Sequence, residues 1–250
     1  MDIKNYYIEK GSGEPLVLLH GNGESSEYFT AQIEYFSKKY RVIAIDTRGH
    51  GKSPRGKAPF TIHQFADDLL DFFDELGIER ANILGFSDGG NIAIIFALKY
   101  PERVAKLVLN GANINVGGMK LPVRIAAEAG YYISKLFFSI FRILRLGDSL
   151  EERAGSLIGN AKKKMELFAL MVKYPAIDAK YLARITVPVL VIAGSRDMIK
   201  EKHTRLIHRS IIGSRLAIIR GSHFVASENP KEFNYKVDEF LEDANRADGV

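Results

Sequence analysis

Short apolar runs alternate with amphipathic runs along most of the chain. The apolar runs are four to seven residues long and predict buried β-strands at Pro15–His20, Arg41–Asp46, Arg80–Phe86, Val104–Leu109, Val187–Ala193 and Leu216–Ile219. The runs between them predict helices: Thr61–Leu76, for example, has apolar residues at helical spacing and ends before Gly77, a helix-stop residue. Short apolar strands separated by helices indicate β-α-β units, and therefore a parallel sheet with helices on both faces.

This alternation stops between Asn113 and Ala183, where no strand is predicted. Leu136–Leu146 is strongly apolar, and Ala161–Tyr174 has the pattern of a basic amphipathic helix. We interpret the segment as a helical insertion rising from the sheet, although its apolar faces also suit ordinary helices that cover the core. At the start of the chain, Asp2–Lys10 and the GSGEP that follows favour an antiparallel hairpin at the edge of the sheet.

The composition is that of a globular protein. Of the 250 residues 46% are hydrophobic, and the 15 Phe and 11 Tyr exclude an intrinsically disordered chain. The apolar stretches are far shorter than the roughly 20 residues that a membrane-spanning helix needs, and the N-terminus has no secretory-signal pattern. No cysteine is present, which excludes disulfides, thiolate metal sites and cysteine nucleophiles. A chain without cysteines also suits a reducing compartment, so we expect a cytoplasmic protein.

The formal net charge of +5 raises the question of a nucleic-acid partner. The excess lies in residues 113–183, which have 11 Lys/Arg against 6 Asp/Glu, whereas the rest of the chain is balanced. Because no nucleic-acid motif accompanies this modest excess, we expect no nucleic-acid partner. No motif calls for a metal or another cofactor, so we predict neither.

The first motif that can carry chemistry is GFSDGG at residues 85–90, which matches G-x-S-x-G. It follows a predicted strand and opens a predicted helix. That is the setting of a nucleophile elbow, in which a serine on a strained turn exposes its hydroxyl above the sheet. The alternative is a glycine-rich turn with an incidental serine, but the strand–turn–helix setting favours Ser87 as a nucleophile.

A serine nucleophile needs a base, and the base needs an orienting acid. Of the six histidines, His223 lies in a loop directly after the apolar run LAIIR, and Asp197 follows the run VPVLVIA. Both therefore lie at the C-terminal edge of the predicted sheet, where α/β active sites are found. Taken separately, Asp197 also fits a helix N-cap and His223 a structural loop histidine, but with Ser87 they fit a catalytic triad.

The HGNG at residues 20–23 follows the first predicted strand and suits a turn that presents a backbone N–H. With the N–H of Asp88 this makes a two-donor oxyanion hole, in which each donor stabilises the transition state by about 2.7–4 kcal/mol. We favour Asn22 as the second donor, and Gly23 is the neighbouring candidate.

The segment DTRGHGKS at residues 46–53 contains GKS and so suggests a phosphate-binding loop. Such a loop requires a glycine at the position that Asp46 occupies. We therefore reject a nucleotide site and predict a structural loop beside the active site.

In order and spacing, LLHGNG, DTRGHGKS, GFSDGG, GSRD and GSHF resemble the motifs of the α/β-hydrolase fold over nearly the full chain. The resemblance implies an α/β fold with a mainly parallel eight-stranded sheet, helices on both faces and a helical cap inserted after strand six. It divides the chain into a core of residues 1–112 and 184–250 and a cap of residues 113–183.

The same resemblance implies a serine hydrolase with Ser87 as nucleophile, Asp197 as acid and His223 as base. Asn110 ends the strand before the cap, which argues against the family variant that carries the acid there. The elbow is also similar to that of valacyclovir hydrolase-like α-amino ester hydrolases, in which an acidic residue beside the serine helps to hold an ammonium group. Asp88 occupies that position, and its alternative role is to support the helix dipole.

We therefore expect a carboxylic-ester hydrolase for small to medium, apolar acyl groups that acts through an acyl-enzyme. An α-amino acid ester hydrolase and a hydrolase-fold receptor with little turnover are the alternatives, because a fold does not imply a function. The apolar residues of 136–144 are more than one buried helix face requires, so we expect Phe137 and Phe141, with Asp88, to contact a small-molecule substrate. The sequence leaves open whether the protein is a monomer or a homodimer.

Overall fold

The computed structural model describes residues 2–144, 151–174 and 176–243. Seven strands form one sheet in the order β1-β3-β2-β4-β5-β6-β7. β1 pairs antiparallel with β3, and the other neighbouring strands are parallel. The strands are β1 Tyr7–Lys10, β2 Pro15–Leu19, β3 Arg41–Ile45, β4 Ala81–Phe86, β5 Val104–Asn110, β6 Val189–Gly194 and β7 Arg215–Ile219.

The sheet has seven strands in the described residues, one fewer than the eight expected, because the N-terminal segment supplies a single edge strand. Before β1, the Tyr6 N–H donates to Ser53 Oγ (2.8 Å) and the Asn5 side chain donates to the carbonyl oxygen of Asp46 (3.0 Å). These bonds tie the chain to the loop after β3, so it does not fold back as a second edge strand. The helical insertion accordingly follows the fifth strand, β5, rather than a sixth.

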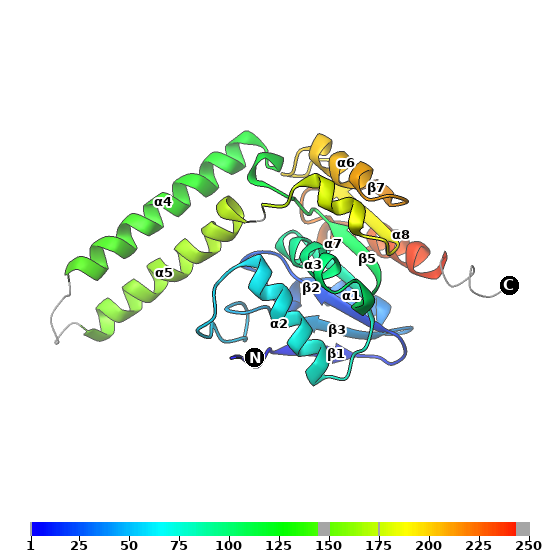
Figure 1. The fold of residues 1–250 in the computed structure, drawn as a ribbon, viewed down its shortest axis with the longest axis horizontal. Helices are drawn as coiled ribbons and strands as arrows, with labels where there is room; N and C mark the ends of the chain where they lie inside the picture. The colour runs from blue at the N-terminus through cyan, green and yellow to red at the C-terminus, as the bar shows by residue number, and fades with distance from the viewer. Residues whose placement is uncertain (1, 145–150, 175, 244–250) are drawn as a thin grey trace.

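Two hydrophobic cores lie on opposite faces of the sheet, because successive side chains of a strand point to opposite sides. Leu19 of β2 belongs to the core that is covered by α2, α3 and α6, and Leu18 belongs to the one covered by α1, α7 and α8. The sheet therefore lies between two helical layers (Figure 1), as the alternation of strands and helices predicts. The helices are α1 Thr30–Phe36, α2 Ile62–Glu75, α3 Asp88–Lys99, α6 Glu201–Ser210, α7 Val225–Glu228 and α8 Pro230–Asp243.

Helices α4 (Leu121–Leu144) and α5 (Glu151–Lys173) form an antiparallel pair, here called the arm, that projects from one side of the body (Figure 1). The base of the arm packs on the body, where Leu170 of α5 joins a core of the sheet. Ile177 and Leu182, farther along the insertion, lie in the same core, so part of the inserted segment belongs to the body. The division into a core domain and a cap domain stays a prediction.

Short 3-10 helices in the described residues are η1 Ser26–Phe29, η2 Pro101–Arg103, η3 Val116–Gly118 and η5 Ala179–Arg184. The apolar run Leu136–Leu146 continues past the end of α4, and residues 145 and 146 lie outside the described ranges. Of the helices that can be described, none combines the length and the apolarity that a membrane crossing requires.

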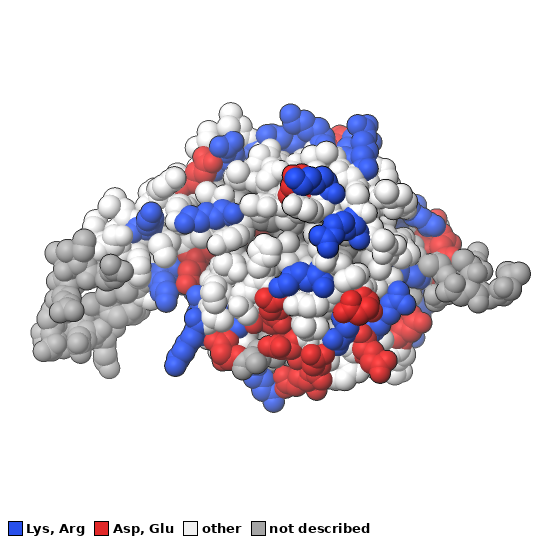
Figure 2. Space-filling view, viewed as in Figure 1, with Lys and Arg blue, Asp and Glu red and all other residues white. Residues whose placement is uncertain are grey.

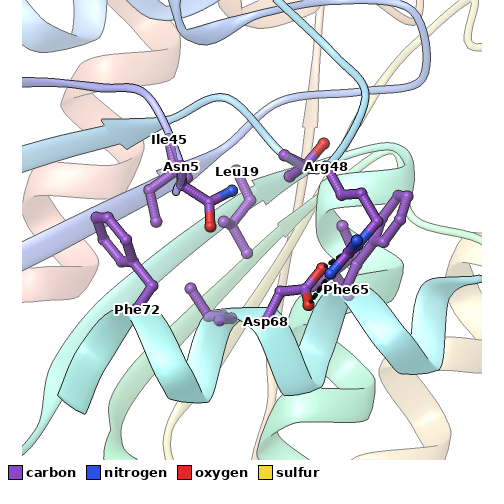
Figure 3. A pocket seen from close by; sticks show the side chains of 10 residues that line it. Asn5, Leu19, Ile45, Arg48, Phe65, Asp68 and Phe72 are labelled. Carbon is purple, nitrogen blue, oxygen red and sulfur yellow. Dashed lines mark hydrogen bonds and ion pairs between the residues drawn. The ribbon is translucent and has the colours of Figure 1, made fainter. Parts of the chain in front are cut away.

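The loop at residues 46–53 is anchored through Arg48, whose side chain is buried. Its guanidinium forms two hydrogen bonds to Asp68 of α2 (2.6 and 2.7 Å) and an ion pair with Asp2 (2.6 Å). Figure 3 shows Arg48 and Asp68 beside a pocket of about 10 Å³, which has room for a single water molecule at most. The loop thus fastens the N-terminus to α2.

We expect Asp68→Asn to lower the free energy of unfolding by about 3 kcal/mol, because the buried charge of Arg48 loses its main partner. The neighbouring Asp67 provides a matched control, since it pairs with Lys99 at the surface. Asp67→Asn should cost less than about 1 kcal/mol. Urea unfolding of the three proteins measures both effects, and equal losses would contradict the stabilising role of the buried pair.

Candidate active site

Ser87 lies on the turn between β4 and α3, with backbone angles φ 51° and ψ −115°. It is the one non-glycine residue with positive φ among the described residues. Such a conformation costs about 1–3 kcal/mol and persists where the surroundings enforce it. Glycines make the turn possible, because a Cβ at Gly85 would overlap the carbonyl of Gly89, and a Cβ at Gly89 would overlap that of Leu19. The serine is therefore held on a strained elbow at the carboxyl end of a central strand.

The structure brings Asp197 and His223 to Ser87. Nε2 of His223 lies 3.0 Å from Ser87 Oγ, and its Nδ1 lies 2.7 Å from Asp197 Oδ1. Asp197 follows β6 and His223 follows β7, so the parallel strands deliver all three residues to one edge of the sheet. The side chains of His223 and Asp197 are 5% and 3% exposed. The three residues that the sequence groups together thus form one continuous hydrogen-bonded chain.

The hydrogen bonds also determine which atoms of this chain carry protons. A carboxylate accepts only, and Asp197 Oδ1 also receives the N–H of Ile199 (2.8 Å). His223 Nδ1 therefore carries the proton that it shares with Asp197, which leaves Nε2 as the acceptor of the neutral ring. The Ser87 hydroxyl donates to Nε2. A serine held in this way can pass its proton to the histidine when its oxygen attacks an electrophile.

Asn22 and Asp88, the two expected oxyanion-hole residues, both line the cavity in front of Ser87. Asp88 begins α3, and backbone N–H groups in the first turn of a helix have no partner within the helix. Asn22 lies in the loop after β2, and its side chain donates to the carbonyl oxygen of Leu167 in α5 (2.7 Å). The loop that carries Asn22 is therefore attached to the base of the arm.

His20 holds the same loop from the other side. Its Nε2 accepts the N–H of Thr47 (3.0 Å), so its Nδ1 is the donor to the carbonyl oxygen of Gly21 (2.7 Å). Burial lowers the pKa of His20, which keeps the ring neutral and preserves this pattern. The position of the loop thus depends on a buried histidine without direct access to the cavity.

Asp88 has a buried carboxyl group with one oxygen unused. Its Oδ1 accepts a hydrogen bond from the Asn91 side chain (3.1 Å), whereas Oδ2 has no partner within the described residues. Burial raises the pKa of Asp88 to about 6, because the charged form is poorly solvated there. Oδ2 is thus a buried acceptor without a partner in a residue that lines the cavity.

The cavity has a volume of about 100 Å³. Its lining residues are Asn22, Glu24, Phe86, Ser87, Asp88, Asn113, Met119, Met171, Met198, Ile199, His223 and Phe224. The three methionines make one part of the wall apolar and adaptable. An apolar cavity of about 150 Å³ holds a benzene molecule, so this one accepts a somewhat smaller group.

Phe137 and Phe141 do not line this cavity, and their expected contact with the substrate stays a prediction. Phe137 is 51% exposed, and the two rings stack on one another with centroids 6.1 Å apart. Both lie in the C-terminal half of α4, the helix that projects from the body as part of the arm (Figure 1). Of the arm, the cavity reaches only the base, through Met171 of α5, and the apolar surplus of α4 points elsewhere.

Comparison with known proteins agrees with this fold. A family model described as "alpha/beta hydrolase fold" matches residues 14–131. The 3-oxoadipate enol-lactonase 2 of Acinetobacter baylyi is 28% identical over 262 residues, with 98% of this chain and 95% of the relative covered. Human serine hydrolase BPHL is 28% identical over 258 residues, with 96% and 84% covered. The crystal structure of a hydrolase from Pseudomonas aeruginosa matches with a TM-score of 0.75 at 27% identity, over 96% of this chain and 94% of that one. The chain has the α/β-hydrolase fold.

In this α/β-hydrolase fold, sequence reasoning missed several residues of the cavity. Phe86, Met198 and Phe224 directly follow or precede the serine, aspartate and histidine of the hydrogen-bonded chain, and that adjacency is a signal that could have found them. Met119 and Met171 have no such signal, because Met171 reaches the cavity through the way the arm packs on the body, and Met119 through its bridge to Ile199.

Proposed function

We propose that this protein is a carboxylic-ester hydrolase that acts through an acyl-enzyme on Ser87. The observation that carries the proposal is the hydrogen-bonded chain from Ser87 through His223 to Asp197, which begins on a strained elbow at a cavity. The relative named as an enol-lactonase supports an ester bond as the target, because a lactone is a cyclic ester.

In the proposed reaction Ser87 Oγ attacks the ester carbonyl carbon while His223 Nε2 takes the hydroxyl proton. The carbonyl oxygen becomes an oxyanion that accepts hydrogen bonds from the backbone N–H groups of Asn22 and Asp88. The intermediate collapses, the ester C–O bond breaks, and His223 gives its proton to the leaving alcohol. His223 then takes a proton from a water molecule that attacks the acyl carbon. The bond between Ser87 Oγ and the acyl group breaks, His223 returns the proton to Oγ, and the carboxylic acid leaves. Asp197 orients and stabilises the imidazolium in both halves.

A panel of p-nitrophenyl esters from acetate to octanoate tests this proposal. We expect sustained release of p-nitrophenolate that a serine-directed fluorophosphonate abolishes. The main alternative is a hydrolase-fold binding protein with little turnover. Failure of the folded protein to turn over every ester of the panel would favour that alternative.

We expect the kcat/KM of this panel to rise from acetyl to butanoyl esters and to fall once the acyl chain exceeds the cavity. Each buried methylene adds about 0.8 kcal/mol, or up to about fourfold in rate. Met171→Ala enlarges the cavity and should move the optimum to a longer acyl group. Phe137→Ala is the matched control on the arm and should leave the optimum unchanged. An optimum on acetyl esters would contradict the apolar acyl site.

The unused oxygen of Asp88 favours a second candidate function, the hydrolysis of α-amino acid esters. If this candidate is correct, the kcat/KM of alanine benzyl ester exceeds that of benzyl propanoate, because the ammonium group of the amino ester donates to the Asp88 carboxylate. Asp88→Asn should remove this difference in kcat/KM. The pKa of Asp88 is about 6, so protonation removes the carboxylate charge as the pH falls. The preference for the amino ester should therefore be larger at pH 7.5 than at pH 5.

Comparison of kcat/KM for the two esters at both pH values measures this preference. The raised pKa means that the carboxyl group takes up its proton near pH 6 instead of near pH 4. Equal rates at pH 7.5 would exclude the amino-ester candidate and leave Asp88 with its support of the α3 dipole.

A further inference from the structure

Helix α4 has an apolar face that points away from α5 and from the body. Ala127, Tyr131 and Ser134 form the buried side of the helix. Six large apolar side chains on the opposite side are 39 to 63% exposed: Ile125, Tyr132, Ile133, Leu136, Phe137 and Ile140. We call these six residues the outer face.

The outer face is continuous along the helix. At 3.6 residues per turn its members occupy an arc of about 140°, and at 1.5 Å per residue they extend over about 22 Å. The charged residues Arg124, Glu128 and Lys135 all fall outside this arc. Scattered apolar side chains are ordinary on a protein surface, whereas a continuous stripe marks an interaction site.

The charge of the arm indicates what covers this face. Residues 121–141 and 159–173, whose side chains are described, include six Lys/Arg and two Glu. Both glutamates already have partners, since Glu128 pairs with Arg124 and Glu166 pairs with Arg55 of the body. The arm therefore presents an excess of positive charge.

The remaining cations are available to a partner. Lys135 on α4 and Lys162, Lys163 and Lys164 on α5 are exposed, and no acidic side chain in the described part of the chain pairs with them. In the view of Figure 2 the arm is largely white with blue side chains, whereas most red side chains lie on the body.

We propose that the outer face of α4 lies flat on the surface of an anionic lipid bilayer. A helix whose uncharged apolar face has basic residues beside it, here Arg124 and Lys135, is the pattern of an interfacial helix, which buries its apolar side chains below the headgroups. Lys135 lies at the edge of the face, where a lysine can extend its ammonium group to the phosphates. A second copy of the chain fits less well, because pairing two outer faces would bring two cationic arms together.

Co-sedimentation with vesicles tests this proposal on the intact protein. The vesicles are phosphatidylglycerol and phosphatidylcholine in equal parts, or phosphatidylcholine alone. We expect the anionic vesicles to bind the protein at least tenfold more tightly, and 0.5 M NaCl to weaken that binding. Leu136→Glu should reduce binding at least tenfold, and Lys162→Gln combined with Lys164→Gln should reduce it several-fold.

Ile212→Glu is the matched control, because Ile212 is 80% exposed in the loop between α6 and β7, away from the arm. It should bind anionic vesicles like the wild type. Circular dichroism checks that the helices of each variant are retained. Absence of binding to anionic vesicles, or equal losses in Leu136→Glu and Ile212→Glu, would overturn the proposal. So would a dimer in light scattering that Leu136→Glu converts to a monomer, because the face would then belong to a second copy.

Discussion

Ser87→Ala should lower the kcat for p-nitrophenyl butanoate by roughly 10⁶-fold, because the acyl-enzyme cannot form without the hydroxyl oxygen. The fold should persist, since alanine differs from serine by one oxygen atom that is not part of a core. Ser87→Gly should be equally inactive and no less stable than Ser87→Ala, because glycine adopts a φ of 51° without strain.

Ester turnover and thermal unfolding of the wild type and the two variants measure these effects. Retention of more than about one per cent of the wild-type kcat by Ser87→Ala would refute Ser87 as the nucleophile, since the residual activity of a triad without its serine is far lower.

The second large effect concerns the two partners of Ser87. His223→Ala removes the base and should lower kcat by roughly 10⁵- to 10⁶-fold. Asp197→Asn should lower it by about 10⁴-fold, because the asparagine amide can donate to Nδ1 and so force the proton onto Nε2, where the base must accept. His208→Ala is the matched histidine control and should retain full activity, since His208 bonds to Ser214 away from the cavity.

Double variants then show whether the three residues act as one unit. His223→Ala combined with Ser87→Ala should lose no more activity than the worse single variant, because the proton relay is already broken. Single-turnover and steady-state rates on the same ester provide the comparison. Losses that multiply would mean that the two side chains contribute independently, which contradicts a single relay.

The hydrogen-bonded chain was predictable from sequence because each member lies within four residues of the end of a short apolar run. Parallel strands bring their carboxyl ends to one edge, so Ser87, Asp197 and His223 converge although up to 136 residues separate them. The elbow was predictable for a second reason, since Gly85 and Gly89 bracket the serine where side chains would collide.

The apolar wall of the cavity was harder to predict from the sequence. Met171 reaches the cavity because of the position of α5 on the body, and helix packing of this kind leaves no local pattern. For a related reason the sequence did not show whether Phe137 reaches the cavity. Periodicity shows that α4 has apolar residues on two sides, but it does not show which side faces a pocket and which faces outward. The strand count differed because the N-terminal segment supplies one edge strand, β1, before which the Tyr6 N–H bonds to the Ser53 side chain.

The hydrogen bond from Asn22 to the arm uses a main-chain acceptor, the carbonyl oxygen of Leu167. Every residue type provides that carbonyl, so the side chains of α5 can diverge among related proteins without loss of the contact. A one-residue insertion or deletion in α5 acts differently, because it turns the helix beyond it by about 100° and moves the acceptor away from the loop. With respect to this contact, the residue type at position 167 is free to change, whereas the length of α5 is restrained.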